Sequence, residues 1–155
     1  MTKKFMTLIG ILGMLLVAAT VSSAQLSAEE QQVISIFEQN APSVVFIKNA
    51  SLQMDWFSAN IYEISTGAGS GFVWDKEGHI ITNFHVIYEA DRIQVVLSNR
   101  KGYQAQVVGY SPDHDLAVLK IQAPPEELVP VQIGSSADLQ VGQKVLSIGN
   151  PFGLD

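Results

Sequence analysis

Six short apolar stretches, separated by turn-forming residues at fairly regular intervals, constrain the fold of this chain more than any other feature. They are residues 44–47, 72–74, 80–82, 92–98, 103–110 and 116–121. In the fourth stretch Ile93, Val95 and Leu97 face one way, because successive side chains of a strand alternate. Several short strands with regular turn signals predict an all-β fold, a small antiparallel barrel or sandwich.

The connections between these stretches are of two kinds. The four residues Asp75 to Gly78 end in glycine and predict a hairpin between two strands, and residues 98–102 and 111–114 also read as turns. Residues 48–66 contain Trp56, Phe57 and Tyr62 without a clear period, and they are predicted to form a long loop. A loop of that length inside a compact barrel is more often functional than idle.

Both flanks of the predicted barrel have recognisable patterns. Ser27 to Glu30 forms a capping box, and apolar residues at helical spacing predict a short helix over residues 28–39 that ends before Pro42. After a linker-like stretch at 122–127, residues 129–148 resume a strand pattern. The predicted organisation is a signal peptide at 1–24, a helical segment at 25–41, a first barrel at 42–134 and the start of a second barrel at 135–155.

The N-terminus has the pattern of a secretory signal peptide. Lys3 and Lys4 precede an apolar run from Leu8 to Ala19, and small residues follow up to Ala24. The competing interpretation is an uncleaved membrane anchor, because Phe5 to Val21 is almost continuously apolar and just reaches the lower limit for spanning a bilayer. The small-residue tail favours cleavage after Ala24 and a periplasmic or secreted protein.

Charge and cysteine content exclude some functions. Removal of residues 1–24 takes away two lysines and no acid, so the net charge changes from −6 to −8 over the remaining 131 residues. An acidic domain of this kind does not suggest nucleic-acid binding. The sequence has no cysteine, so an exported domain would hold together without disulfides.

The glycine-rich segment Gly67-Ala68-Gly69-Ser70-Gly71 does not predict a cofactor site. It lacks the third glycine of a dinucleotide fingerprint and the Gly-Lys-Ser/Thr of a phosphate loop. Ser70 is also not in a Gly-x-Ser-x-Gly nucleophile elbow. The glycines are expected to let a strand bend or another backbone approach closely, and no cofactor is predicted.

The candidate catalytic residues are His85, in "TNFHV", and Asp115, in "DHDLAVLKI". A lone histidine in a loop is usually polar surface, but an acid just before an apolar strand would place its carboxylate at a barrel rim. A carboxylate beside an imidazole fixes the tautomer of the ring and supports its protonated form. A metal site is not predicted, since His79, His85 and His114 lack the close spacing of zinc helices and there is no cysteine.

Three blocks together resemble the HtrA/Deg family of chymotrypsin-fold serine proteases. They are "GAGSGFVWDKEGHIITNFHV", "DHDLAVLKI" with its Asp thirty positions after the His, and "LQVGQKVLSIGNPFGLD". The resemblance covers about residues 30 to 155 and implies a chymotrypsin-like, six-stranded first barrel. Position by position, His85 matches the general base and Asp115 the orienting acid, and Thr82, Asn83 and Val86 match the frame around the histidine.

The resemblance also implies what the chain needs in order to work. The family's nucleophilic serine lies in a Gly-Asn-Ser-Gly-Gly-Pro segment of the second barrel, and no such segment occurs here. The chain is therefore expected to be a fragment that is inactive alone. The family implies an ATP-independent endopeptidase of unfolded or damaged envelope proteins, built on trimers through the region of residues 28–39 and 48–66. PDZ modules are common in the family, but nothing in these residues indicates one.

Two other functions stay open at this stage. A catalytically inactive homologue acting as a chaperone or protein-binding module would keep the barrel, and even His85 and Asp115, without a serine. A plain binding barrel would lack the dyad geometry, so side chains of His85 and Asp115 more than about 5 Å apart would count against a catalytic role.

Overall fold

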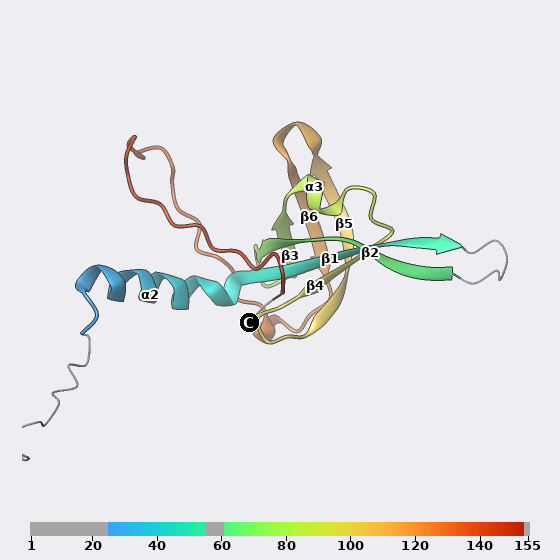
Figure 1. Ribbon diagram of the computed structural model, residues 1–155, viewed down its shortest axis with the longest axis horizontal. Helices are drawn as coiled ribbons and strands as arrows, with labels where there is room; N and C mark the ends of the chain where they lie inside the picture. The colour runs from blue at the N-terminus through green and yellow to red at the C-terminus, as the bar shows by residue number, and fades with distance from the viewer. Residues whose placement is uncertain (1–24, 55–60, 154–155) are drawn as a thin grey trace, which may run out of the picture. The chain divides into compact units, whose positions relative to one another are not determined.

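A computed structural model describes residues 25–54 and 61–153 of the chain, and its main feature is a closed barrel of six antiparallel strands (Figure 1). Around the barrel the strands follow the order β1-β2-β3-β6-β5-β4. Their bounds are Val44–Met54 (β1), Ile61–Val73 (β2), His79–Thr82 (β3), Arg92–Val96 (β4), Gly102–Ser111 (β5) and Leu116–Ile121 (β6). The structure therefore confirms the predicted all-β fold as a barrel.

Short helical segments lie between and beside the strands. They are α2 (Ala28–Asn40), η1 (Ala41–Ser43), α3 (Phe84–Ile87), η2 (Pro112–His114) and η3 (Pro125–Glu127). Two of these segments hold or adjoin the candidate residues. Helix α3 carries His85, and η2 ends just before Asp115.

The core fills the barrel with aliphatic side chains that alternate along the strands. Its fully covered members, with no more than 1% of each residue exposed, are Val45, Ile47, Val73, Ile80, Val95, Ala117, Leu119, Ile121 and Leu128. The prediction that Ile93, Val95 and Leu97 share one face is confirmed, since all three are buried. Burying side chains of this size stabilises a domain by roughly 1.5–3 kcal/mol each before the entropy of ordering the chain is counted.

The predicted hairpin between β2 and β3 is present. The Asp75 carboxylate accepts hydrogen bonds from the backbone N–H groups of Glu77 and His79, which shapes the turn. Gly78 has φ of +97°, and a side chain there would collide with the carbonyl oxygen of Ile121. Only glycine suits this position.

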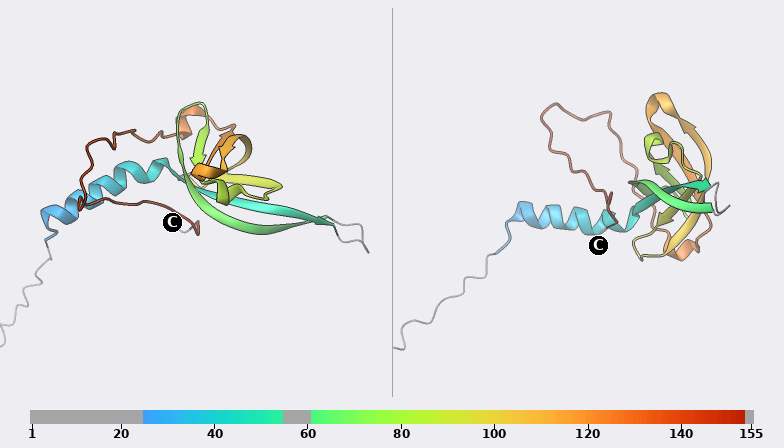
Figure 2. Two further views of the ribbon diagram at one scale, coloured as in Figure 1. Left: turned by 90° about the horizontal axis from the view of Figure 1, so that it is seen from above. Right: turned by 45° about the vertical axis from the view of Figure 1, so that its right-hand side comes forward.

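The predicted loop at residues 48–66 is wrong in the described residues, because β1 and β2 continue as a paired hairpin through 48–54 and 61–66. Strand β4 pairs with β1 only as far as Ala50. Beyond that point the two strands pair only with each other and extend away from the rest of the barrel (Figure 2). In this outer part Leu52 and Ile64 are exposed, so the pairing there does not require apolar alternation. Trp56 and Phe57 lie outside the described residues.

The strand pattern read at residues 129–148 is also wrong, since these residues form turns and extended coil. Among the described residues no strand pairs with this segment, although the backbone N–H of Val131 donates to the carbonyl of Val73. Its apolar side chains, such as Val141 and Val145, are exposed. A strand needs a neighbour to take its hydrogen bonds, and apolar alternation alone does not supply one.

The chain divides into two compact units, residues 1–31 and residues 32–155. In the described part of the first unit, Ser27 and Glu30 form the predicted capping box, with Glu30 N–H donating to Ser27 Oγ and Ser27 N–H donating to Glu30 Oε2. Within the part of the chain that the structure describes, no helix is both long and apolar enough to cross a membrane. The predicted signal peptide at 1–24 lies outside that part.

Candidate active site

His85 lies on α3, a four-residue helix that follows the end of β3 after the single residue Asn83. A helix this short is held by its surroundings and not by its own hydrogen bonds. Val86 and Ile87 enter the core, and Asn49 Nδ2 donates to the carbonyl oxygen of Val86 at 2.5 Å. These contacts fix the direction in which the His85 side chain leaves the barrel.

The glycine-rich segment of β2 makes room for this helix. A Cβ on Gly69 would lie 2.5 Å from Cγ2 of Val86, and one on Gly71 would lie 2.6 Å from the carbonyl oxygen of Ile81. The prediction that these glycines let another backbone approach closely is confirmed at Gly71, whereas the close neighbour of Gly69 is the side chain of Val86.

Asp115 lies between η2 and β6 in the left-handed region, with φ of 51° and ψ of 44°. Its backbone N–H donates to the carbonyl of Pro112, which closes the turn. Aspartate tolerates this backbone conformation better than most residues. The Asp115 side chain is 45% exposed, so the carboxylate lies at the barrel rim.

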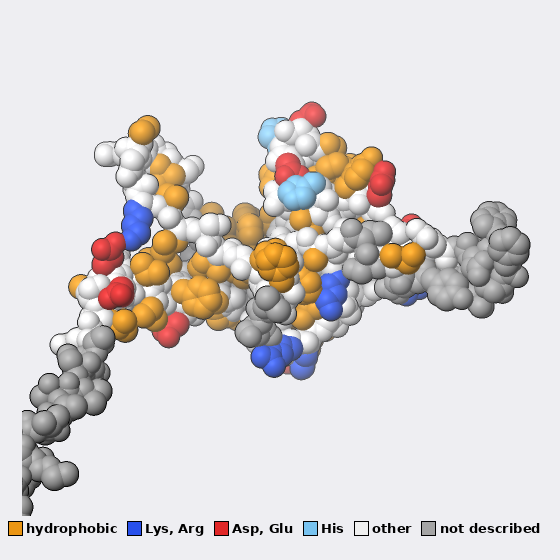
Figure 3. All heavy atoms as spheres, in the orientation of Figure 1, with side chains coloured by type: hydrophobic (Ala, Val, Ile, Leu, Met, Phe, Trp, Pro, Cys, Tyr) orange, Lys and Arg blue, Asp and Glu red, His pale blue; other side chains and the backbone are white. Residues whose placement is uncertain are grey.

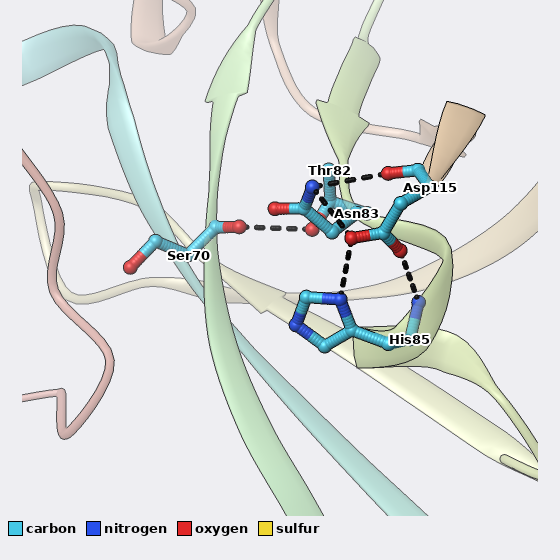
Figure 4. Close-up of polar contacts among 5 residues, drawn as sticks. All are labelled: Ser70, Thr82, Asn83, His85 and Asp115. Carbon is cyan, nitrogen blue, oxygen red and sulfur yellow. Dashed lines mark hydrogen bonds and ion pairs between the residues drawn. The ribbon is translucent and has the colours of Figure 1, made fainter.

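The two candidate residues are in direct contact (Figure 4). His85 Nδ1 is 2.7 Å from Asp115 Oδ2, and the backbone N–H of His85 donates to Asp115 Oδ1 at 2.9 Å. The backbone hydrogen bond from His85 and the bond from its side chain lower the pKa of the Asp115 carboxyl below its usual value. Asp115 is therefore an anion at neutral pH and accepts the proton of Nδ1.

The contact determines which ring nitrogen can act as a base. With Nδ1–H donating to the carboxylate, the neutral ring carries its lone pair on Nε2. The His85 side chain is 70% exposed, and Figure 3 shows histidine and acidic side chains at the surface over α3. This arrangement can accept a proton at Nε2 from a hydroxyl group that is brought to it.

A hollow adjoins the imidazole. It has a volume of about 230 Å³ and is lined, besides His85, by Asn49, Ser51, Gly67, Ala68, Val86, Tyr88 and Glu89.

Two further polar residues join β3, β2 and the acid. Asn83 Nδ2 donates to the backbone carbonyl of Asp115 at 3.0 Å and to its Oδ2 at 3.2 Å. Thr82 Oγ1 donates to the carbonyl of Ser70 at 2.8 Å. The sequence identified Asn83 only as part of the frame around His85, since a contact thirty-two positions away leaves no local pattern.

The other two histidines lie elsewhere in polar contacts of their own. His79 Nδ1 is 2.6 Å from Asp75 Oδ2, and His114 Nδ1 is 2.8 Å from Ser111 Oγ. Possible ligand atoms of Asp75, Glu77 and His79 all lie within 4.8 Å of one another. Asp75 is occupied by the hairpin turn, so this group has a structural explanation that needs no metal.

The six-stranded barrel and the contact between His85 and Asp115 indicate a trypsin-like peptidase, and comparison with known proteins gives the same class. Residues 69–155 match the family model of the trypsin-like peptidase domain. The crystal structure of Deg5 superimposes with a TM-score of 0.67 at 40% identity, over 84% of this chain and 61% of that one.

Individual relatives identify the family within this class of peptidase. The chain is 50% identical over 131 residues to "Protease Do-like 1, chloroplastic" of Arabidopsis thaliana, covering 84% of this chain and 30% of the relative. It is 47% identical over 87 residues to a "Probable periplasmic serine endoprotease DegP-like" of Pseudomonas fulva, covering 56% of this chain and 18% of the relative. The chain thus belongs to the HtrA/Deg family of trypsin-like serine proteases. It spans less than a third of the length of these two relatives.

Proposed function

We propose that the chain provides the general base and its orienting acid to an ATP-independent serine endopeptidase of the HtrA/Deg type. The observation that carries this proposal is the contact of 2.7 Å between His85 Nδ1 and Asp115 Oδ2. The contact is well inside the limit of about 5 Å beyond which a catalytic pairing would be doubtful.

In the proposed reaction, a serine from a longer form of the protein supplies the nucleophile. Its Oγ forms a bond to the carbonyl carbon of a peptide while His85 Nε2 takes the hydroxyl proton. The tetrahedral intermediate then breaks its C–N bond, and His85 returns the proton to the leaving amine. Water repeats the sequence on the acyl-enzyme. Asp115 holds the ring and stabilises its positive charge throughout.

Substrates, assembly and location belong to the same proposal. The substrates are unfolded or damaged proteins of the cell envelope, and the working form is a trimer or a larger assembly. Support comes from the family and from Ile34 and Phe37 of α2, which are 41% and 55% exposed and offer an apolar contact surface. Residues 1–24 direct export, which the periplasmic name of one relative supports, while other relatives are named chloroplastic.

The decisive experiment compares variants of the longer protein on an unfolded substrate. Without ATP, the wild type should cleave casein, whereas His85→Ala should lose activity by about 10⁶-fold and Asp115→Asn by about 10⁴-fold. His114→Ala is the matched control, because this exposed histidine contacts Ser111 and not the dyad. Its rate should equal that of the wild type.

Two results would overturn the proposal. Cleavage that persists in His85→Ala would show that another group is the base. A longer protein that binds casein without cleaving it would favour the inactive, chaperone-like homologue. Sedimentation of the longer protein would test the trimer, and N-terminal sequencing of the mature protein would test cleavage after Ala24.

A further inference from the structure

Asn83 occupies the N-cap position of α3 yet does not cap the helix. Its backbone is extended, with φ of −82° and ψ of 148°, and its side chain makes no hydrogen bond to the helix N–H groups. Asparagine is among the residues that normally make that bond. The amide is instead turned toward Asp115 (Figure 4).

Both contacts of the Asn83 amide nitrogen go to one residue. One N–H bond is directed at the backbone carbonyl of Asp115 and the other at Oδ2, the same oxygen that accepts from His85 Nδ1. An amide NH₂ group has two hydrogens and a carboxylate oxygen can accept two hydrogen bonds, so all three contacts form together. The backbone bond also holds Asp115 at its positive φ.

We infer that Asn83 is a positioning residue, which fixes the Asp115 carboxylate so that Oδ2 faces the His85 ring. The inference rests on the proposed function, in which that carboxylate orients the general base. Without Asn83, the Asp115 carboxylate keeps the hydrogen bond from the backbone N–H of His85 to Oδ1 but loses the donor that holds Oδ2, so the preference of the ring for the Nδ1–H tautomer weakens. The effect of Asn83 on a reaction therefore passes through Asp115 and not through substrate.

Nuclear magnetic resonance of the imidazole tests the inference on the whole 155-residue chain, without any nucleophile. In ¹⁵N-labelled wild type, His85 should show a protonated Nδ1, a bare Nε2 and a slowly exchanging Nδ1 proton. In Asn83→Ala and Asn83→Asp the two tautomers should mix, and the Nδ1 proton should exchange at least about tenfold faster, as expected when a charge-assisted contact loosens.

Two variants separate positioning from simple stabilisation. Asn83→Asp keeps a good N-cap residue but has no hydrogen-bond donor in its side chain. If Asn83 served only to cap α3, this variant would have the same His85 ring signals as the wild type. Thr82→Val removes the neighbouring hydrogen bond to Ser70. It should lower the melting temperature while the His85 ring signals stay as in the wild type. If Asn83→Ala and Asn83→Asp both show the His85 ring signals of the wild type, the inference is overturned.

Activity of the longer enzyme gives the second measurement. Asn83→Ala should lower kcat by about 10²-fold with little change in KM, the size of effect that misplacement of a catalytic group causes. If the wild-type longer protein does not cleave substrate, the proposed function fails, but the ring signals still decide whether Asn83 positions Asp115.

Discussion

The hydroxyl of Ser70 accepts a hydrogen bond of 2.7 Å from the backbone N–H of Asn150, eighty positions further along the chain. The carbonyl of the same residue accepts from Thr82, just before the helix that bears His85. Ser70 thus connects the turn at residues 149–153 to the frame of the dyad through one residue of β2.

Replacing Ser70 with alanine should release that turn. The contact is a neutral, partly buried hydrogen bond, worth about 0.5–1.5 kcal/mol, so exchange of the Asn150 amide should accelerate by about 2–10-fold. Hydrogen exchange followed by nuclear magnetic resonance measures this. Ser135→Ala is the control, because Ser135 also accepts a backbone N–H, that of Ala137, but far from Asn150 in sequence. Equal acceleration in both variants would contradict the prediction.

Gly71→Ala should destabilise the barrel by about 1–3 kcal/mol, because the new methyl group would be forced against the backbone oxygen of Ile81. Urea denaturation measures the loss. Gly109→Ala on β5 provides the comparison, since a Cβ there has no atom within 4 Å. It should be neutral or slightly stabilising. If the two variants unfold at the same urea concentration, the contact with Ile81 is not what makes glycine necessary at position 71.

Glu127→Gln should weaken the barrel at neutral pH and much less in acid. The Glu127 carboxylate accepts from Lys101, Tyr103 and Asn99 and ties η3 to the β4–β5 turn. These bonds, the one from Lys101 first, lower the pKa of Glu127 from 4.5 to about 2. A folded-state pKa below the unfolded value stabilises fully above pH about 4.5, and this stabilisation is lost as the pH falls toward about 2.

Urea midpoints of wild type and Glu127→Gln at about pH 7 and about pH 3 check the effect of this carboxylate. The difference between the two proteins should shrink at the lower pH. Glu126→Gln, at the exposed neighbouring position, should change the midpoint little at either pH. A difference that is independent of pH would mean that the charge of Glu127 is not what stabilises the fold.

Asp75→Ala should open the β2–β3 turn. The variant loses two hydrogen bonds from backbone N–H groups and the contact with the His79 ring. A hydrogen bond to a charged acceptor contributes at most about 1.5–3 kcal/mol to stability. We expect a net loss of about 1–3 kcal/mol in the free energy of unfolding, measured by thermal melting. Asp113→Ala, an exposed acid in the η2 turn, should melt close to the wild type. Similar melting of the two variants would exclude this role for Asp75.

The sequence predicted the helix at 28–39 and the strand segments that enclose the core, but it missed the outer part of β1 and β2. Residues 116–121 matched β6 at both ends, because Ala117, Leu119 and Ile121 alternate toward a buried interior. In the outer part of the β1–β2 hairpin, the described apolar side chains do not face such an interior. Leu52 and Ile64 are 40% and 43% exposed, so apolar alternation was absent and a loop was predicted.

The candidate site was predictable in its residues but not in its geometry. The spacing of His85 and Asp115 indicated the pair, whereas their approach to 2.7 Å depends on a positive φ at Asp115 and on a helix of four residues. The strand predicted at 80–82 ends at Thr82, as β3 does, but the short helix that carries His85 was not predicted. Neither feature has a periodic pattern, because both arise from contacts between distant segments.

The close packing of Val86 against Gly69 limits how this sequence can evolve. With Cγ2 of Val86 2.5 Å from where a Cβ of residue 69 would stand, a larger residue at either position must displace the helix that carries His85. A larger side chain at one site is tolerated only after a compensating reduction at the other. The two positions should therefore show strong epistasis, and a lineage can acquire the substitution Gly69→Ala only after a smaller residue has replaced Val86.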